Sequence, residues 1–175
     1  MCGFIPPAYR GGPDCVHNIG MRLLTSLVLA AALGSFAMAA PKRLTSFTAL
    51  MSALNSGHEV AVVVDYAKTV MVIDGKEEPA PKAIGGMTFS PWEFFEKGVV
   101  RNDKAYVVSS ETHMIAHPRY GYVNNYVRMR IYDDNSVEIV ARYLTLEKQE
   151  VVMDETFKGK ISSGKDKEGV ALFAR

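Results

Sequence analysis

The sequence predicts an α+β fold in which an N-terminal helix packs on a curved antiparallel sheet. Three observations carry this prediction. One apolar stripe has helical spacing, a series of strand-like segments follows it, and short turns join those segments. Short connections favour antiparallel pairing, because parallel strands need long crossovers. The same pattern is compatible with a sheet that closes toward a barrel, and the sequence leaves that point open.

The helix is expected between residues 44 and 57. A side-chain oxygen of Thr45 or Ser46 can cap its first turn, and Gly57 suits the left-handed position that ends it. Apolar residues recur at spacings of three and four, which gives one stripe to lay on a sheet. The stripe consists of Leu44, Phe47, Leu50, Met51 and Leu54.

A buried strand is expected at 59–66, with Val60, Val62 and Val64 on one face, and a second short strand at 70–73. Asp74-Gly75 indicates a turn. Two prolines in 76–82 favour a surface loop. The paired glycines in 83–89 suggest a bulge or a close backbone approach. For 90–95 we expect a short helical turn capped by Ser90, with Pro91 first and with Trp92 and Phe95 on one face plugging the core.

The strongest strand pattern is a long hairpin between Tyr122 and Val152. Val127, Met129 and Ile131 alternate with polar or aromatic residues, and 133–136 supplies turn chemistry. Further strands are expected at 105–110 and 112–116, for which a single strand with a break is the alternative, and at 150–161. The last segment, 170–173, is expected to form an edge strand or a tail.

Residues 1–39 are predicted to lie outside the folded domain. Residues 21–39 have the features of a bacterial signal peptide: Arg22 is the positive charge, an apolar run follows, and Ala37-Met38-Ala39 is a small-x-small cleavage site. We therefore expect cleavage after Ala39 and a periplasmic or secreted chain, residues 40–175, folded as a single α+β domain. No later segment approaches the roughly 20 apolar residues that a membrane-spanning helix needs.

Residues 1–20 precede this complete signal peptide. We interpret them as the result of a start assigned too early, with Met21 as the initiator; an extended leader or a lipidated cysteine is the alternative. Cys2 and Cys15 both lie upstream of Met21, so the expected mature chain has no thiol for a disulfide or a zinc site. Its acidic and basic residues are equal in number, and no basic block predicts binding to nucleic acid.

Candidate catalytic chemistry is sparse, so the sequence predicts neither an enzyme nor a cofactor. His113 and His117 would share a strand face roughly 13 Å apart, too far for one metal ion. Glu111 and His113 could form a polar pair, although an exposed strand face is the favoured interpretation. Asp65 follows buried valines and needs a partner, for which Arg128, Arg130 or Arg142 are the candidates. A structural salt bridge is favoured there over catalysis.

Tyrosines are the candidate ligand-binding residues. They combine a large apolar body with a polar tip and are frequent at binding surfaces, although they also fill the cores of small β domains. Tyr106, Tyr122 and Tyr126 are the residues that would line a barrel-like pocket, if one forms.

Several motifs in order resemble the VirK family of small exported bacterial proteins. The similarity covers most of 44–161 and is carried by Leu44-Thr45-Ser46-Phe47, the strand ending in Asp65-Tyr66, Ala83-Ile84-Gly85-Gly86-Met87 and Tyr122-Val123-Asn124-Asn125-Tyr126-Val127. The resemblance implies a secreted or periplasmic protein, associated with virulence in some plant-associated bacteria, and it supplies no catalytic residues. Relatives often carry two cysteines where this chain has Thr69 and Gly159, which implies that these positions are neighbours in space.

The favoured function is therefore an exported accessory or binding protein without enzymatic activity. The expected partner is an unknown protein or a small apolar ligand. A small-ligand carrier with a barrel-like pocket is the alternative, and a hydrolase with an unrecognised site is a third hypothesis.

Overall fold

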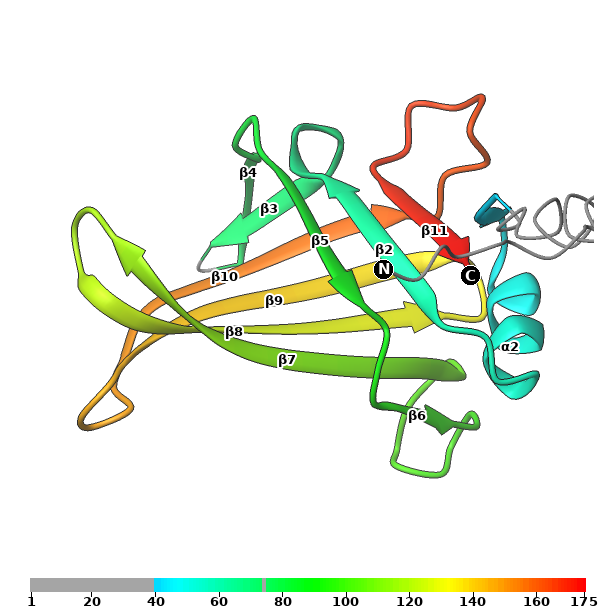
Figure 1. Ribbon diagram of the computed structural model, residues 1–175, viewed down its shortest axis with the longest axis horizontal. Helices are drawn as coiled ribbons and strands as arrows, with labels where there is room; N and C mark the ends of the chain where they lie inside the picture. Colours follow the sequence, from blue (N-terminus) through cyan, green and yellow to red (C-terminus); the bar gives the residue numbers. More distant parts are fainter. Residues whose placement is uncertain (1–39, 74) are drawn as a thin grey trace, which may run out of the picture. The chain divides into compact units, whose positions relative to one another are not determined.

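The computed structural model describes residues 40–73 and 75–175, so the predicted leader and its cleavage site lie outside the described residues. This part of the chain forms two antiparallel sheets and one nine-residue α-helix (Figure 1). The prediction of a β-rich domain with one N-terminal helix is confirmed. The suggestion of a barrel is wrong, because each sheet ends in two open edges within the described residues.

The smaller sheet has four strands in the order β1 (Lys42–Leu44), β11 (Val170–Ala174), β2 (Val60–Asp65) and β5 (Ile84–Thr88). The last strand, β11, pairs with β1 on one side and with β2 on the other. The expectation of an edge strand or a tail at 170–173 is therefore wrong. Its alternating apolar side chains fit an interior position, where Val170 and Leu172 are fully buried.

The larger sheet has seven strands. Their order is β4 (Lys76–Pro79), β3 (Val70–Ile73), β10 (Val151–Lys160), β9 (Ser136–Thr145), β8 (Gly121–Tyr132), β7 (Tyr106–His117) and β6 (Trp92–Phe95). The predicted long hairpin is β8–β9, and β7 pairs with β8 along its whole length without a break. Four long strands therefore form the centre of this sheet.

The core lies between the two sheets. Val60, Val62 and Val64 of β2 are at most 2% exposed, and they belong to the same buried cluster as Met129 and Ile131 of β8. Period-two alternation sends these side chains inward and their neighbours outward. We call the core-facing side of the larger sheet its inner face, and the opposite side its outer face.

Helix α2 (Phe47–Asn55) forms where the apolar stripe predicts it. The Ser46 hydroxyl accepts a hydrogen bond from the Ala49 amide at 3.2 Å, and Gly57 takes a positive φ of 77° after the last turn. Leu50 and Leu54 are 0% and 4% exposed, as expected, whereas Phe47 and Met51 are half-buried, and Leu44 belongs to strand β1 instead of the helix.

The β8–β9 turn connects the hairpin to this helix. Asn135 has a φ of +67°, its side-chain oxygen accepts the Phe47 amide at 2.7 Å, and its carbonyl accepts the Ile161 amide at 3.0 Å. Asparagine tolerates the left-handed region better than most residues. One residue therefore joins the turn, the start of α2 and the end of β10.

Two predicted irregular segments are strands instead. Residues 76–79 form β4, paired with β3 as an exposed edge strand that tolerates Pro79 at its end. Residues 92–95 form β6, paired with β7, so the predicted helical turn is wrong. The long neighbouring strand offers backbone hydrogen bonds that a local cap cannot match. Trp92 and Phe95 consequently lie on opposite faces instead of sharing one.

The paired glycines of β5 mark a close approach and not a bulge. The β2–β5 register runs without a shift. A Cβ at Gly85 would lie 3.0 Å from the Tyr66 ring, and a Cβ at Gly86 would lie 3.1 Å from the Val62 carbonyl oxygen. Side chains at both positions would therefore push against β2 and the turn that follows it.

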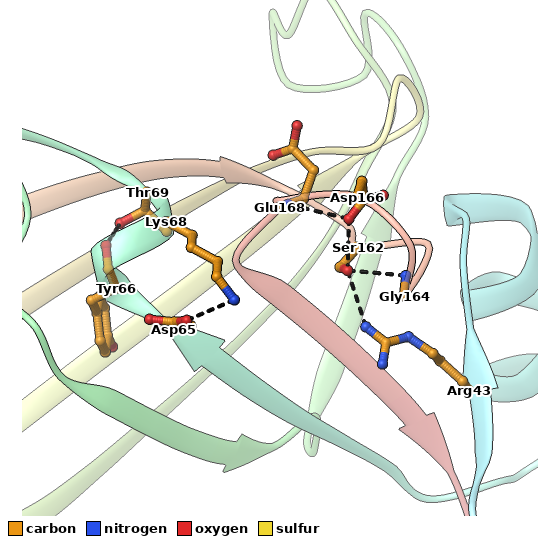
Figure 2. A network of polar contacts seen from close by, with 9 residues as sticks. All are labelled: Arg43, Asp65, Tyr66, Lys68, Thr69, Ser162, Gly164, Asp166 and Glu168. Carbon is orange, nitrogen blue, oxygen red and sulfur yellow. Dashed lines mark hydrogen bonds and ion pairs between the residues drawn. The ribbon is translucent and has the colours of Figure 1, made fainter.

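The loop between β10 and β11 is held by polar contacts (Figure 2). The Ser162 hydroxyl accepts a hydrogen bond from Arg43 at 3.0 Å and donates one to Asp166 at 2.8 Å. Hydrogen bonds from Ser163 and Ser162 hold the pKa of the Asp166 carboxyl well below its usual range.

Asp65 pairs with Lys68 at 2.9 Å, so the predicted pairing with Arg128, Arg130 or Arg142 is wrong. Those arginines lie on the outer face of the larger sheet, whereas Asp65 belongs to the smaller one.

Thr69 and Gly159 are neighbours, as the resemblance implied. A Cβ at Gly159 would lie 3.8 Å from the Thr69 Cβ, within the range of about 3.5 to 4.5 Å found in disulfides. The double substitution Thr69→Cys/Gly159→Cys, made together with Cys2→Ser and Cys15→Ser, should therefore form a disulfide in air. We expect the free energy of unfolding to rise by about 2 to 4 kcal/mol relative to the reduced form, measured by urea denaturation with and without dithiothreitol.

The matched control is Thr69→Cys/Lys158→Cys in the same background. Residue 158 is one position away on β10, and its side chain points to the other face, so this pair should keep both thiols in a thiol titration. Free thiols in the oxidised Thr69→Cys/Gly159→Cys protein would contradict the observed packing of β3 on β10.

A second prediction concerns the Lys104–Asp134 ion pair, which connects the β8–β9 turn to the segment before β7 at 2.6 Å. Hydrogen bonds from Lys104 and then Ser136 lower the pKa of Asp134 from 3.8 to about 2. A lowered pKa stabilises the fold above pH 3.8, and this contribution is lost as the pH falls toward 2. Asp134→Asn should therefore reduce the free energy of unfolding more at pH 6 than at pH 3, measured by urea denaturation.

Lys104→Gln should reproduce this pattern, because it removes the first partner of the same carboxylate. A stability difference between native protein and Asp134→Asn that is equal at the two pH values would refute this account.

Candidate functional site

The candidate site lies on the outer face of the larger sheet, where β6, β7 and β8 run side by side. In register, Phe95 lies opposite Tyr106, and Tyr106 opposite Tyr132. Arg128 and Arg130 project from β8 on this face, because the alternate residues Met129 and Ile131 are buried in the core. We call this group of arginines and aromatic rings the outer cleft.

Two open pockets flank the outer cleft. One, of about 410 Å³, is lined by Trp92, Phe95, Ser110 and both arginines among others. The other, of about 460 Å³, lies toward the segment 100–104. Tyr106 and Arg130 line both pockets, so they form the ridge between them.

Aromatic rings lie beneath the arginine of this ridge. Tyr106 is 8% exposed and stacks on Phe95, with ring centroids 5.1 Å apart. The Arg130 guanidinium lies 5.2 Å from the centre of the Tyr106 ring. A cation over an aromatic face is favoured electrostatically and is held in one orientation. Arg130 is therefore positioned by its surroundings before any ligand arrives.

The two arginines share a single carboxylate. Oε1 of Glu138 lies 3.5 Å from Nη1 of Arg130 and 3.9 Å from Nη2 of Arg128. The Arg130 Nε atom is buried and has no hydrogen-bond partner within the described part of the chain. Each guanidinium carries five N–H donors, so donors outnumber acceptors here. Such a pair can receive a further carboxylate, which guanidinium groups bind through paired hydrogen bonds.

The structure places only one of the three predicted tyrosines at these pockets. Tyr122 and Tyr126 lie on the same face of β8 as Arg128, but neither lines a pocket described above. Tyr122 is 65% exposed and lies ten residues along the strand from Tyr132, which is the partner of Tyr106. At about 3.3 Å per residue, that separation is about 33 Å. The structure therefore does not bring Tyr106 and Tyr122 together.

The predicted polar residues of β7 lie on the inner face instead. Nε2 of His113 is 3.3 Å from the Asn125 amide nitrogen, and the His117 ring stacks on Tyr120 with centroids 4.8 Å apart. In residues 40–73 and 75–175, no three histidine, cysteine, aspartate or glutamate side chains are grouped to hold a metal ion. The outer cleft itself was missed in the sequence, although alternating arginines opposite a tyrosine-containing strand were a visible signal.

Comparison with known proteins places the chain in a family. The VirK protein family model matches residues 43–149. A crystal structure of a VirK family protein from Legionella pneumophila superposes with a TM-score of 0.58 at 17% identity, covering 75% of this chain and 98% of that one. At that identity the likeness concerns the fold. A search of curated proteins finds no match. No helix in the described ranges is long and apolar enough to cross a membrane. The match over most of its length shows that the chain belongs to the VirK family.

Proposed function

We propose that this protein is an exported, virulence-associated binding protein that recognises a carboxylate group of a partner protein at the outer cleft. One observation carries the proposal: two guanidinium groups on an aromatic floor share one carboxylate between two open pockets. The excess of donors favours an anion, and the aromatic walls favour an apolar neighbour of that anion.

The chemistry of this cleft supports binding more than catalysis. Guanidinium groups stay protonated at any physiological pH and neither accept nor release a proton readily. The groups that surround the arginines are aromatic rings, hydroxyls, the paired carboxylate of Glu138 and a second carboxylate, Glu93, which lines the same pocket. Such a surface recognises a charged side chain and orients it, which is the task of an accessory or binding protein.

Export is the part of the proposal that the leader supports. Expression of the full chain in a Gram-negative bacterium should give a periplasmic or secreted protein that begins at Ala40, measured by intact-mass spectrometry and N-terminal sequencing. Leu29→Arg places a charge in the apolar run and should leave the unprocessed chain in the cytoplasm. Exported protein that retains residues ahead of Met21 would contradict the proposed processing.

Carboxylate recognition can be followed through Trp92, the single tryptophan of the chain, because Trp92 borders the pocket of about 410 Å³ although its side chain packs on the core side of β6. Tetraglutamate should change its fluorescence in a saturable way, whereas neutral tetraglutamine should not. Arg128→Gln/Arg130→Gln should weaken tetraglutamate binding about tenfold or more, because it removes the charged donors.

Arg142→Gln is the matched control. Arg142 also lies on the outer face, but it pairs with Asp154 at 3.0 Å and lines neither pocket. This variant should bind tetraglutamate like the native protein. Equal responses to the two peptides, or equal weakening by Arg142→Gln, would refute recognition at the outer cleft.

A small-ligand carrier is the second candidate function. The observation that favours it is not the expected tyrosine-lined barrel but a pocket of about 150 Å³ between the two sheets. That pocket is separate from the outer cleft, on the other face of β7 and β8.

A further inference from the structure

The pocket between the sheets is built by four strands and the turn after β2. Residues of β2 and β5 form one wall, and residues of β7 and β8 form the other. Its volume of about 150 Å³ is roughly ten times what one bound water requires. Its lining includes Tyr66, Gly85, Glu111, His113, Asn125 and Met129.

Asn125 lines this pocket and carries an unused hydrogen-bond acceptor. Its amide nitrogen lies 3.3 Å from Nε2 of His113, the residue directly opposite it on β7. This contact occupies the nitrogen side of the amide. The oxygen, Oδ1, is buried and has no hydrogen-bond partner within the part of the chain that the structure describes. A buried acceptor without a donor is unfavourable, so the site is short of a donor.

Glu111 supplies a negative charge. It is half-buried on the inner face, two residues before His113, and lies opposite Val127. Among the described residues, no lysine or arginine lies within ion-pair distance of its carboxylate. The inward positions of β7 to β10 carry a second carboxylate, Glu155, and no lysine or arginine. The inner face is therefore acidic where the outer face is basic.

Tyr66 completes the polar side of the pocket. Its ring packs across Gly85, where a Cβ would lie 3.0 Å from the ring and 3.4 Å from the hydroxyl oxygen. Burial first, and then the nearby Tyr143 and Glu111, raise the pKa of the Tyr66 phenol. The phenol therefore stays neutral, so its oxygen can accept a hydrogen bond.

We propose that this pocket binds a primary ammonium group on an aliphatic chain. An ammonium has three N–H donors, and the pocket-lining residues Asn125, Glu111 and Tyr66 carry an amide oxygen, a carboxylate and a hydroxyl that can accept them. The remaining walls are apolar, with Val64, Met87, Val127 and Met129 available to contact the aliphatic chain. The pocket thus matches both ends of such a ligand, which is either a free alkylamine or the side chain of a lysine.

The test is a titration of the ¹⁵N-labelled full chain with n-butylammonium chloride, followed by NMR chemical shifts. Saturable shifts are expected at the pocket residues, including Gly85 and Asn125. The uncharged analogue n-butanol should produce none at the same concentration. Glu111→Gln should weaken binding about tenfold or more, because it keeps the shape and removes the charge. Glu78→Gln, on the exposed edge strand β4, removes the same charge elsewhere and should change nothing.

A second variant covers the case in which Glu111→Gln does not fold. Gly85→Ala forces the Tyr66 ring away from β5, and it should weaken n-butylammonium binding while the spectrum stays dispersed. Native affinity in either folded variant, or equal binding of n-butanol, would overturn the proposal.

The source of the ammonium group is read from a third probe, Nα-acetyl-lysine methylamide. Tighter binding of this probe than of n-butylammonium indicates a lysine side chain, and weaker binding indicates a free amine. The inference does not depend on the outer cleft. Arg128→Gln/Arg130→Gln should leave n-butylammonium affinity unchanged, so failure of either proposal is seen separately.

Discussion

The turn at Asn135 fixes the register of the long strands, and this register decides the face on which every side chain of the sheet lies. Because successive side chains alternate, a slip of one residue between β8 and β9 would move Met129 and Ile131 to solvent and the arginines into the core. Asn135 resists such a slip in two ways. It adopts the left-handed conformation of the turn, and it holds both the first amide of α2 and the amide of Ile161.

This single constraint accounts for the two chemically different faces of one sheet. On β8, Arg128 and Arg130 point outward, whereas Asn125 points inward. On β7, Tyr106 supports the arginines outside and Glu111 lines the pocket inside. A ligand that suits one face is therefore repelled by the other. The short strands of the smaller sheet cover only part of the inner face of the long strands (Figure 1).

The parts of the fold that could be predicted are those whose periodicity is local. Local spacing indicates which side chains are buried in the stripe of α2, in the valines of β2 and in the alternation of β8 and β9. The edge strands β4 and β6 could not be read in this way, because pairing with a neighbour, and not their own pattern, makes them strands. The interior position of 170–173 could not be predicted for the same reason, because it depends on pairing with β1, which is far away in sequence.

The candidate sites were harder to predict for a related reason. The sequence predicts Arg128 and Arg130 only as partners for Asp65, yet their carboxylate is Glu138 on the next strand. Tyr106 and Tyr122 were grouped by type, but the length of β8 separates them. Asn125 gave no signal at all, because an unpaired amide oxygen is visible only when the residues around it are in place. Composition suggests which residue types can bind, and only the register shows which of them meet.

The contact between Thr69 and Gly159 has a consequence for how the domain matures. Where a covalent bridge would fit, the methyl group of a threonine packs against a glycine, and residues 40–175 contain no cysteine. The packing of Thr69 against Gly159, where β3 meets β10, therefore does not depend on the redox potential. The described domain can therefore fold without an oxidoreductase, and a reducing agent breaks no bond within residues 40–175.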